Sequence, residues 1–174
     1  MGSNPTLSAR KIIIGFMDLK TFSYNLNAGP FNTADELNNK WTEGNCRRLL
    51  QYYFLSEHKI FLKPEQILCP NGYYKTGKFV FKKGHHIDIS QLQIGDVLYA
   101  ERIRDKSGKL INRAREKFNS LDEYLISLHS AIFQNIAGEE ILHATQIEGR
   151  SCIWSLEQFI HYYKPIAVKR IINK

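Results

Sequence analysis

The chain of 174 residues is 43% hydrophobic and 24% charged, which is enough for one domain with a real core and too little for two of ordinary size. Its formal net charge of +7 points to an anionic partner, but the lysines and arginines are scattered and lack the aromatic framework of a nucleic-acid module. We therefore interpret the charge as a solvated basic surface, do not expect a nucleic-acid partner, and expect a single domain over residues 1–174.

Residues 1–30 are interpreted as an N-terminal extension. Their apolar run, residues 12–17, is closed by Asp18 and is too short to span a membrane. Met1-Gly2-Ser3 is typical of an expression-tag remnant, and the sequence indicates no compartment. It does not indicate an oligomeric state either.

Two helices are predicted next, each from its N-terminal cap. Thr33 and Glu36 form a capping box, in which each side chain accepts a hydrogen bond from the other's backbone N–H, and this predicts a short helix ending near Trp41. Asn45 is a good N-cap for a second helix, which ends before Lys59. Apolar residues recur on one face of that second helix: Cys46, Leu49, Leu50, Tyr53 and Phe54.

The second half of the chain is dominated by strands. Pro64 and Asn71-Gly72 mark turns, and residues 78–81 are predicted as a short edge strand. The polar segment 101–121 is interpreted as a surface insertion, and Ser155 begins a capping pattern for a short helix through His161. The later predicted strands are 96–103, 123–133, 140–146, 151–154 and 166–172. This order predicts an α+β fold, with N-terminal helices packed on a C-terminal antiparallel meander.

The chain has three cysteines, so at least one cannot pair within it, and no disulfide framework is expected. No cysteine or histidine pair has zinc-ligand spacing, and we expect no metal or organic cofactor. Cys46 falls in the first turn after Asn45, where free N–H groups and partial positive charge favour a thiolate and could bind an oxyanion. Cys69 and Cys152 are interpreted as structural.

Two of the six histidines interrupt predicted strands that are otherwise apolar. His129 and His143 lie equally far from Ile136, the centre of a predicted hairpin, so we expect them directly opposite each other, with Cβ atoms about 4.5–5.5 Å apart. Such a pair suits a general base and the group that orients it. The alternative is that each is a satisfied core residue, and a one-residue slip of the turn would separate their faces. The remaining histidines are expected to be cap or surface residues: His58, His85, His86 and His161.

Together these features favour Cys46 as a nucleophile, His129 as general base and later acid, and His143 as the orienter of His129. Four short blocks in this order also resemble the NlpC-type branch of the papain-like cysteine peptidases. Residues 45–52 are similar to the family's Asp-Cys-Ser-Gly helix, and residues 92–99 to its Leu-x-Pro-Gly-Asp-Leu strand. Residues 129–133 are similar to its His-Val-Gly-Ile-Tyr strand, and residues 141–144 to its Ile-His-Ala strand. The resemblance covers residues 33–172 and implies a papain-like core with a Cys46–His129–His143 triad.

The chain departs from the family pattern beside the nucleophile. Asn45 replaces the usual Asp and is a comparable N-cap. Arg47 and Arg48 replace Ser-Gly, and both are candidate substrate-binding residues because they would help to hold a thiolate and could bind an acidic substrate. The family's upstream tyrosine has only Tyr24 as a weak counterpart, so substrate specificity does not carry over.

Members of the family mostly cut the stem peptides of bacterial peptidoglycan. The resemblance therefore implies a thiol hydrolase that cleaves an amide bond, and a cell-wall peptide endopeptidase is the leading interpretation. Two alternatives stay open. One is a thiol amidase or acyltransferase acting on a non-wall substrate, and the other is a non-catalytic binding module for an anionic polymer.

Overall fold

The computed structural model describes residues 23–40, 42–82, 88–111, 117–135 and 137–172. His85, His86 and the apolar run 12–17 lie outside the described residues. The helices are α1 (Ala34–Lys40), α2 (Cys46–His58), α3 (Pro64–Ile67), α4 (Asn71–Lys75), α5 (Leu121–Ile126) and α6 (Leu156–Tyr162). The strands are β1 (Ser23–Tyr24), β2 (Glu43–Gly44), β3 (Lys78–Lys82), β4 (Val97–Arg102), β5 (His129–Asn135), β6 (Glu140–Thr145), β7 (Arg150–Ser155) and β8 (Tyr163–Arg170).

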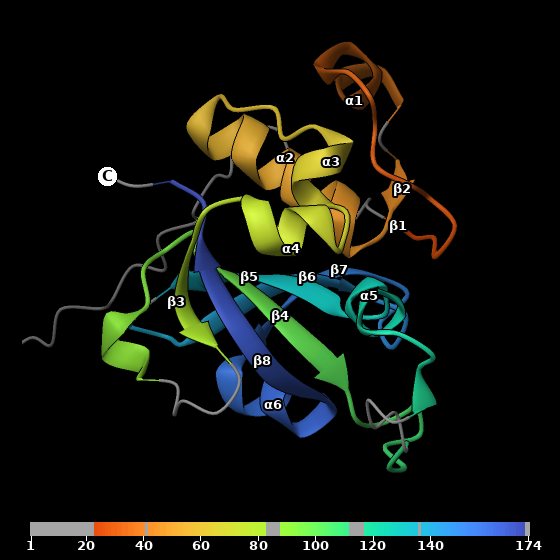
Figure 1. Ribbon diagram of the computed structural model, residues 1–174, viewed down its shortest axis with the longest axis vertical. Coiled ribbons are helices and arrows are strands. Elements are labelled where there is room, and N and C mark those ends of the chain that lie inside the picture. Colours follow the sequence, from red (N-terminus) through yellow and green to blue (C-terminus); the bar gives the residue numbers. More distant parts are fainter. Residues whose placement is uncertain (1–22, 41, 83–87, 112–116, 136, 173–174) are drawn as a thin grey trace, which may run out of the picture.

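The described strands form one sheet of eight, in the order β2-β1-β7-β6-β5-β4-β8-β3. Neighbouring strands pair antiparallel, except for the parallel pair β1–β2. Helices α2, α3 and α4 lie on one side of the sheet and α6 on the other (Figure 1). Each side has its own apolar cluster, one containing Leu49, Leu50 and Phe54 of α2 and the other Phe159 of α6. The predicted α+β arrangement of helices on an antiparallel sheet is confirmed.

Helix α2 begins and ends as the sequence predicts. The side chain of Asn45 caps its first turn, and the backbone reverses at Lys59 in a left-handed conformation with φ of 59°. Gln51 is the polar exception on its buried face. Its amide accepts a hydrogen bond from Phe31 N and donates to Phe31 O and Leu62 O, at 2.8, 2.8 and 2.9 Å. These bonds hold the segments before and after α2 against the helix.

The predicted strand 123–133 is wrong in its first half. Residues Leu121–Ile126 form helix α5, and strand β5 begins only at His129. The cause is a cap: Ser120 Oγ accepts a hydrogen bond from Glu123 N at 3.1 Å, and the Glu123 carboxylate accepts one from Asn119 N at 2.9 Å. Ser120 and Glu123 have capping-box spacing, so the signal for this helix was present in the sequence.

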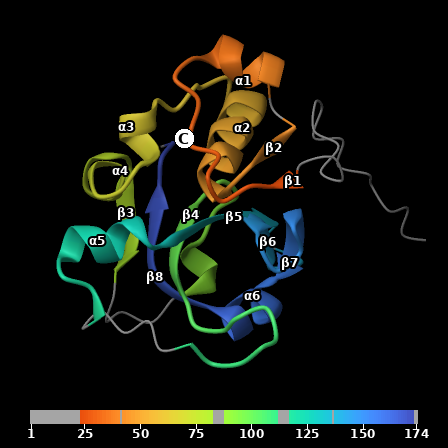
Figure 2. The ribbon, with the colours of Figure 1, turned by 90° about the vertical axis from the view of Figure 1, so that its right-hand side faces the viewer.

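Residues 23–30, predicted as part of an N-terminal extension, contribute strand β1 and the buried Ala28 to the fold. Strand β1 pairs with β2 and β7, and it brings the N-terminal end of the described chain beside the start of α2 (Figure 2). Downstream, β8 begins at Tyr163, three residues before the predicted start at Ile166. These two differences matter because Tyr24 of β1 and Tyr163 of β8 both reach the candidate site.

Candidate active site

A cavity of about 270 Å³ lies where the first turn of α2 meets the beginning of β5. Cys46 and His129 both line it. Helix α2 packs on one face of the sheet, and the two histidines lie on the other. Cys46 is the first residue of α2 and His129 is the first residue of β5, so both lie at the edge where the two faces meet the cavity. Its lining consists of Tyr24, Leu26, Asn45, Cys46, Arg47, Arg102, Ile126, Ser127, Leu128, His129, Ala144, Thr145, Gln146 and Tyr163.

Cys46 is the first residue of α2, as predicted, and its side chain is partly exposed. Asn45 Oδ1 accepts hydrogen bonds from Arg47 N at 2.9 Å and Arg48 N at 3.4 Å. Two first-turn amides are therefore already satisfied by the cap. The Cys46 N–H makes no hydrogen bond to any described residue, so it is the amide of this turn that can meet an oxyanion.

His129 and His143 are in direct contact. His129 Nε2 lies 3.1 Å from His143 Nδ1, a hydrogen-bond distance between two ring nitrogens. His143 Nε2 is buried and has no partner among the described residues, so His129 is the polar neighbour of His143. The other ring nitrogen of His129, Nδ1, is left for the cavity. No hydrogen bond joins Cys46 to His129 in the described part of the chain.

The register of the hairpin differs from the predicted one by two residues. Strands β5 and β6 pair Ile132 with Leu142 and Phe133 with Ile141, which places His143 opposite Ala131 and not opposite His129. Asn135 pairs with Glu140, so the turn is centred between residues 137 and 138 and not at 136, and a bulge between Phe133 and Asn135 then changes the register by one residue. Because the shift is an even number of residues, the two histidines stay on the same face as diagonal neighbours.

Aromatic rings enclose both histidines. Tyr163 stacks on His129, with ring centroids 4.5 Å apart and an angle of 21° between planes, and its hydroxyl is 2.9 Å from Thr145 Oγ1. Trp154 packs against His143 with centroids 4.4 Å apart. These contacts fix the two ring planes; His143 is fully buried, and His129, which lines the cavity, remains partly exposed. Tyr163 and Trp154 were not predicted as site residues, because no spacing within the sequence relates either of them to His129 or His143.

The enclosure keeps both imidazoles neutral at physiological pH. Burial, with smaller contributions from the charges of Arg102 and Arg47, lowers the pKa of His129 to about 3. Burial also lowers the pKa of His143, and the neighbouring His129 lowers it further. A neutral imidazole has one lone pair and one N–H, so the contact between the rings is a single hydrogen bond, donated by one ring and accepted by the other.

The two candidate substrate-binding arginines are placed differently. Arg47 lines the cavity, and its Nη2 donates to Ile126 O at 2.6 Å. Arg48 is not part of the lining: it donates to Gly29 O at 2.6 Å and Glu43 O at 2.9 Å, and it lies over the ring of Phe31 at 4.0 Å. Arg48 thus ties the segment before α2 to the helix.

Two further residues bring polar groups to the cavity. Tyr24, a weak candidate from sequence alone, lines it from β1, and burial raises the pKa of its hydroxyl. Arg102 enters from the end of β4, inside the segment predicted as a surface insertion. No local pattern marks Arg102 as a site residue, because its position depends on the pairing of β4 with β5 and β8.

The other two cysteines lie outside the cavity lining. Burial raises the pKa of the Cys69 thiol to about 11 and that of the Cys152 thiol to about 12. Both thiols are therefore protonated and unreactive at neutral pH.

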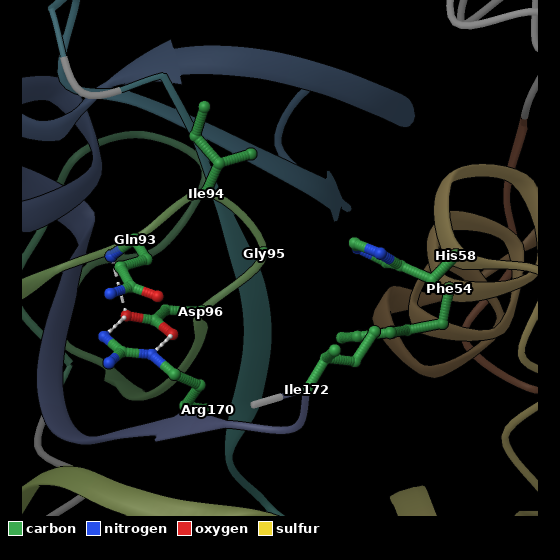
Figure 3. A pocket seen from close by; sticks show the side chains of 8 residues that line it. All are labelled: Phe54, His58, Gln93, Ile94, Gly95, Asp96, Arg170 and Ile172. Carbon is green, nitrogen blue, oxygen red and sulfur yellow. Dashed lines mark hydrogen bonds and ion pairs between the residues drawn. The ribbon is translucent and has the colours of Figure 1, made fainter. Parts of the chain in front are cut away.

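A second cavity, of about 350 Å³, lies at the opposite end of α2. His58 and Phe54 of α2 face the loop that carries Ile94 and Gly95, and Asp96 and Arg170 form an ion pair beside them (Figure 3). It contains no cysteine, so it offers no counterpart of Cys46.

Among the described residues, no group of three or more histidine, cysteine or acidic side chains is placed to hold a metal ion. None of the described helices is long and apolar enough to cross a membrane.

Comparison with solved structures identifies the architecture. NlpC2 from Trichomonas vaginalis superposes with a TM-score of 0.50 at 13% sequence identity, over 88% of this chain and 42% of that one. NlpC1 from the same organism superposes with a TM-score of 0.50 at 12% identity, over 88% of this chain and 40% of that one. The chain has an NlpC-type papain-like fold.

This likeness is one of structure and not of sequence. No family model and no curated protein sequence matches the chain. The chain also spans only about two fifths of the length of the two NlpC structures. The NlpC-type fold is compatible with a cysteine hydrolase, and the helix-start Cys46 and the His129–His143 pair are consistent with one.

Proposed function

We propose that the chain is a cysteine hydrolase that cleaves an amide bond, with Cys46 as nucleophile, His129 as general base and acid, and His143 as its orienter. The observation that carries the proposal is the contact of His129 Nε2 with His143 Nδ1, 3.1 Å apart, beside a cavity that Cys46 also lines. This contact occupies one nitrogen of His129 and directs the other to the site. Residues 1–174 form one hydrolase domain in this proposal.

The tautomer that catalysis requires has His129 Nε2–H donating to His143 Nδ1. The lone pair of His129 Nδ1 is then available to take the Cys46 thiol proton. The thiolate attacks the carbonyl carbon of the substrate, a C–S bond forms, and the Cys46 N–H donates to the developing oxyanion. The mechanism requires the Cys46 sulfur to come within hydrogen-bond distance of His129 Nδ1 when substrate binds, and catalytic hydrogen bonds often shorten in this way.

Breakdown of this intermediate cleaves the C–N bond. The proton held by His129 passes to the leaving amine, and the acyl group remains on Cys46 as a thioester. Water then attacks the thioester while His129 takes its proton, and collapse releases the carboxylic acid and restores the thiol. His143 accepts a hydrogen bond from His129 throughout, so it supports the imidazolium that forms transiently.

A cell-wall stem peptide is the leading substrate, through the resemblance of the sequence blocks and the NlpC-type fold. A second candidate is a thiol amidase or acyltransferase on a non-wall substrate. The observation that favours it is the pair Arg47 and Arg102 in the cavity, since Arg47 replaces the small serine typical of the family.

Incubation with purified stem peptides, followed by mass spectrometry of the products, tests the proposal. We expect fragments from the wild type, none from Cys46→Ala, and unchanged release from Cys152→Ala, since Cys152 lies outside the cavity. Release by Cys46→Ala at the wild-type rate would refute the assigned nucleophile. Absence of fragments from wild-type protein that forms an acyl-enzyme with an activated ester would refute the wall substrate and favour the second candidate.

A further inference from the structure

We infer that Arg47 and Arg102 form an anion-binding subsite beside Cys46, and that the substrate carries a carboxylate next to its scissile amide. This inference rests on the proposed hydrolase function and adds the substrate class. The two arginines come from different elements, the first turn of α2 and the end of β4, and line the same cavity.

Neither arginine has an acidic partner among the described residues. Arg47 donates to the carbonyl of Ile126, and Arg102 donates to Arg104 O at 2.9 Å and Gln146 Oε1 at 3.2 Å, all of them neutral acceptors. Within the described residues, the ion pair of Arg170 with Asp96 is far along the sheet, and no ion pair involves Arg47 or Arg102. The described residues that line the cavity include no Asp or Glu. None of the described residues that line the cavity therefore balances its positive charge.

Both guanidinium groups retain donors for a ligand. A guanidinium has five N–H groups. Arg47 uses one nitrogen and Arg102 two in the bonds above, and these bonds fix each side chain without saturating it. Arg48 shows the contrast, because its bonds and its contact with Phe31 turn it away from the cavity. A planar fork held in place with free N–H groups is suited to a carboxylate.

Without a bound anion, the positive charges of Arg47 and Arg102 oppose the proton transfer to His129 that the proposed mechanism requires. Their charges disfavour the imidazolium form that His129 must adopt after it takes the thiol proton. A substrate carboxylate between them offsets this repulsion and also holds the amide close to Cys46. The cavity volume of about 270 Å³ suits a group the size of one amino-acid side chain, so the carboxylate belongs to a residue adjoining the cleaved bond.

Alkylation of Cys46 by two reagents of almost equal size tests this without knowledge of the substrate. Iodoacetate is anionic and iodoacetamide is neutral, and both transfer a carbon to sulfur with loss of iodide. Site-resolved mass spectrometry gives the iodoacetate-to-iodoacetamide rate ratio at Cys46, divided by the same ratio for glutathione. We expect this normalised ratio to be about ten at low salt and to fall as the salt concentration rises.

The variants Arg47→Gln and Arg102→Gln should each lower the normalised ratio at least threefold. Arg150→Gln is the matched control, because Arg150 is exposed, lies outside the cavity lining, and loses the same charge; it should leave the ratio unchanged. A wild-type ratio near one, with Cys46 still reacting faster with iodoacetamide than Cys69 and Cys152, would overturn the subsite and leave the hydrolase proposal standing. Labelling of Cys46 no faster than of those two cysteines would overturn both.

Discussion

Asp96→Asn is expected to destabilise the protein without affecting the chemistry of Cys46. The Asp96 carboxylate is 1% exposed and accepts two hydrogen bonds from Arg170, from Nε at 2.9 Å and Nη2 at 2.8 Å, and one from Gln93 N at 2.8 Å (Figure 3). It thus ties the start of β4 to the end of β8. The Gly95-Asp96 block, part of the family resemblance, is on this account a structural feature and not a catalytic one.

The size of the effect follows from burial. Removing one partner of a fully buried ion pair costs about 3–5 kcal/mol. Arg170 is 24% exposed and also donates to Gln91 O, so the loss here should be smaller, about 2–3 kcal/mol. For a chain of this length that corresponds to a fall in Tm of roughly 5–10 °C.

Urea unfolding followed by far-UV circular dichroism measures the change in the free energy of unfolding. Asp122→Asn is the control, because Asp122 is exposed and should change stability by about 0.5 kcal/mol or less. Cys46 alkylation by iodoacetamide should stay within twofold of wild type in folded Asp96→Asn. A loss below about 0.5 kcal/mol would refute the energetic reasoning, and slow alkylation in stably folded protein would refute the structural role.

Three further predictions concern the surroundings of the site. The pKa values of His129 and His143 are lowered in the folded state, so the unfolded chain takes up protons first as the pH falls. The free energy of unfolding should therefore be constant above about pH 7.5 and should fall below about pH 6.5. The fall should be at most about 1.4 kcal/mol per pH unit for each histidine. Urea titrations between pH 8 and 5 check this, and a flat profile would contradict the lowered pKa values of the two histidines. Tyr163→Phe loses the hydrogen bond to Thr145 but keeps the stack on His129, so it should lower the free energy of unfolding in urea by about 1 kcal/mol and leave the rate of Cys46 acylation near wild type. Tyr163→Leu loses the stack as well and should slow acylation. Equal acylation rates in the two variants would argue against a role for the stack. Arg48→Gln should lower the free energy of unfolding by about 1–2 kcal/mol, because it removes two hydrogen bonds to carbonyls and the contact with Phe31; unchanged stability would show that these contacts are not maintained in solution.

Local signals predicted much of the fold. Asn45 and the apolar spacing after it located α2, and the glycine-containing turn at Gly149, where φ is +69°, located the β6–β7 hairpin. Ser155 predicted the start of α6, and its Oγ accepts a hydrogen bond from Gln158 N at 3.1 Å. These features depend on residues within a few positions of one another, which is the range over which caps and turns act.

The errors have physical causes of two kinds. Apolar Leu125, Ile126 and Leu128 suggested a continuous strand. The N-cap at Ser120 instead stabilises a first helical turn, so residues Leu121–Ile126 form a helix. The hairpin register depended on the position of the turn, set by the pairing of Asn135 with Glu140, and on a one-residue bulge before Asn135; no residue type nearby signals either feature. The predicted contact of His129 with His143 survived only because the resulting shift kept both on one face.

The candidate site was less accessible to sequence reasoning than the fold. The direction of a side chain depends on its neighbours in space, so two adjacent arginines, Arg47 and Arg48, could not be told apart by their position. Tyr24, Arg102 and Tyr163 reach the cavity through strand pairings between distant segments. Spacing within one element carries no information about such pairings.

In the proposed mechanism, Cys46 becomes an acyl-enzyme that His129 helps to form and to hydrolyse. Reaction with p-nitrophenyl acetate, followed by rapid quench and mass spectrometry of the intact protein and its peptides, measures both steps. We predict a burst of nitrophenol with the acetyl group on Cys46, followed by its turnover, and loss of both the burst and the turnover in His129→Ala. Acetylation of Cys46 no faster than of Cys69 and Cys152, or an undiminished burst in His129→Ala, would contradict the account.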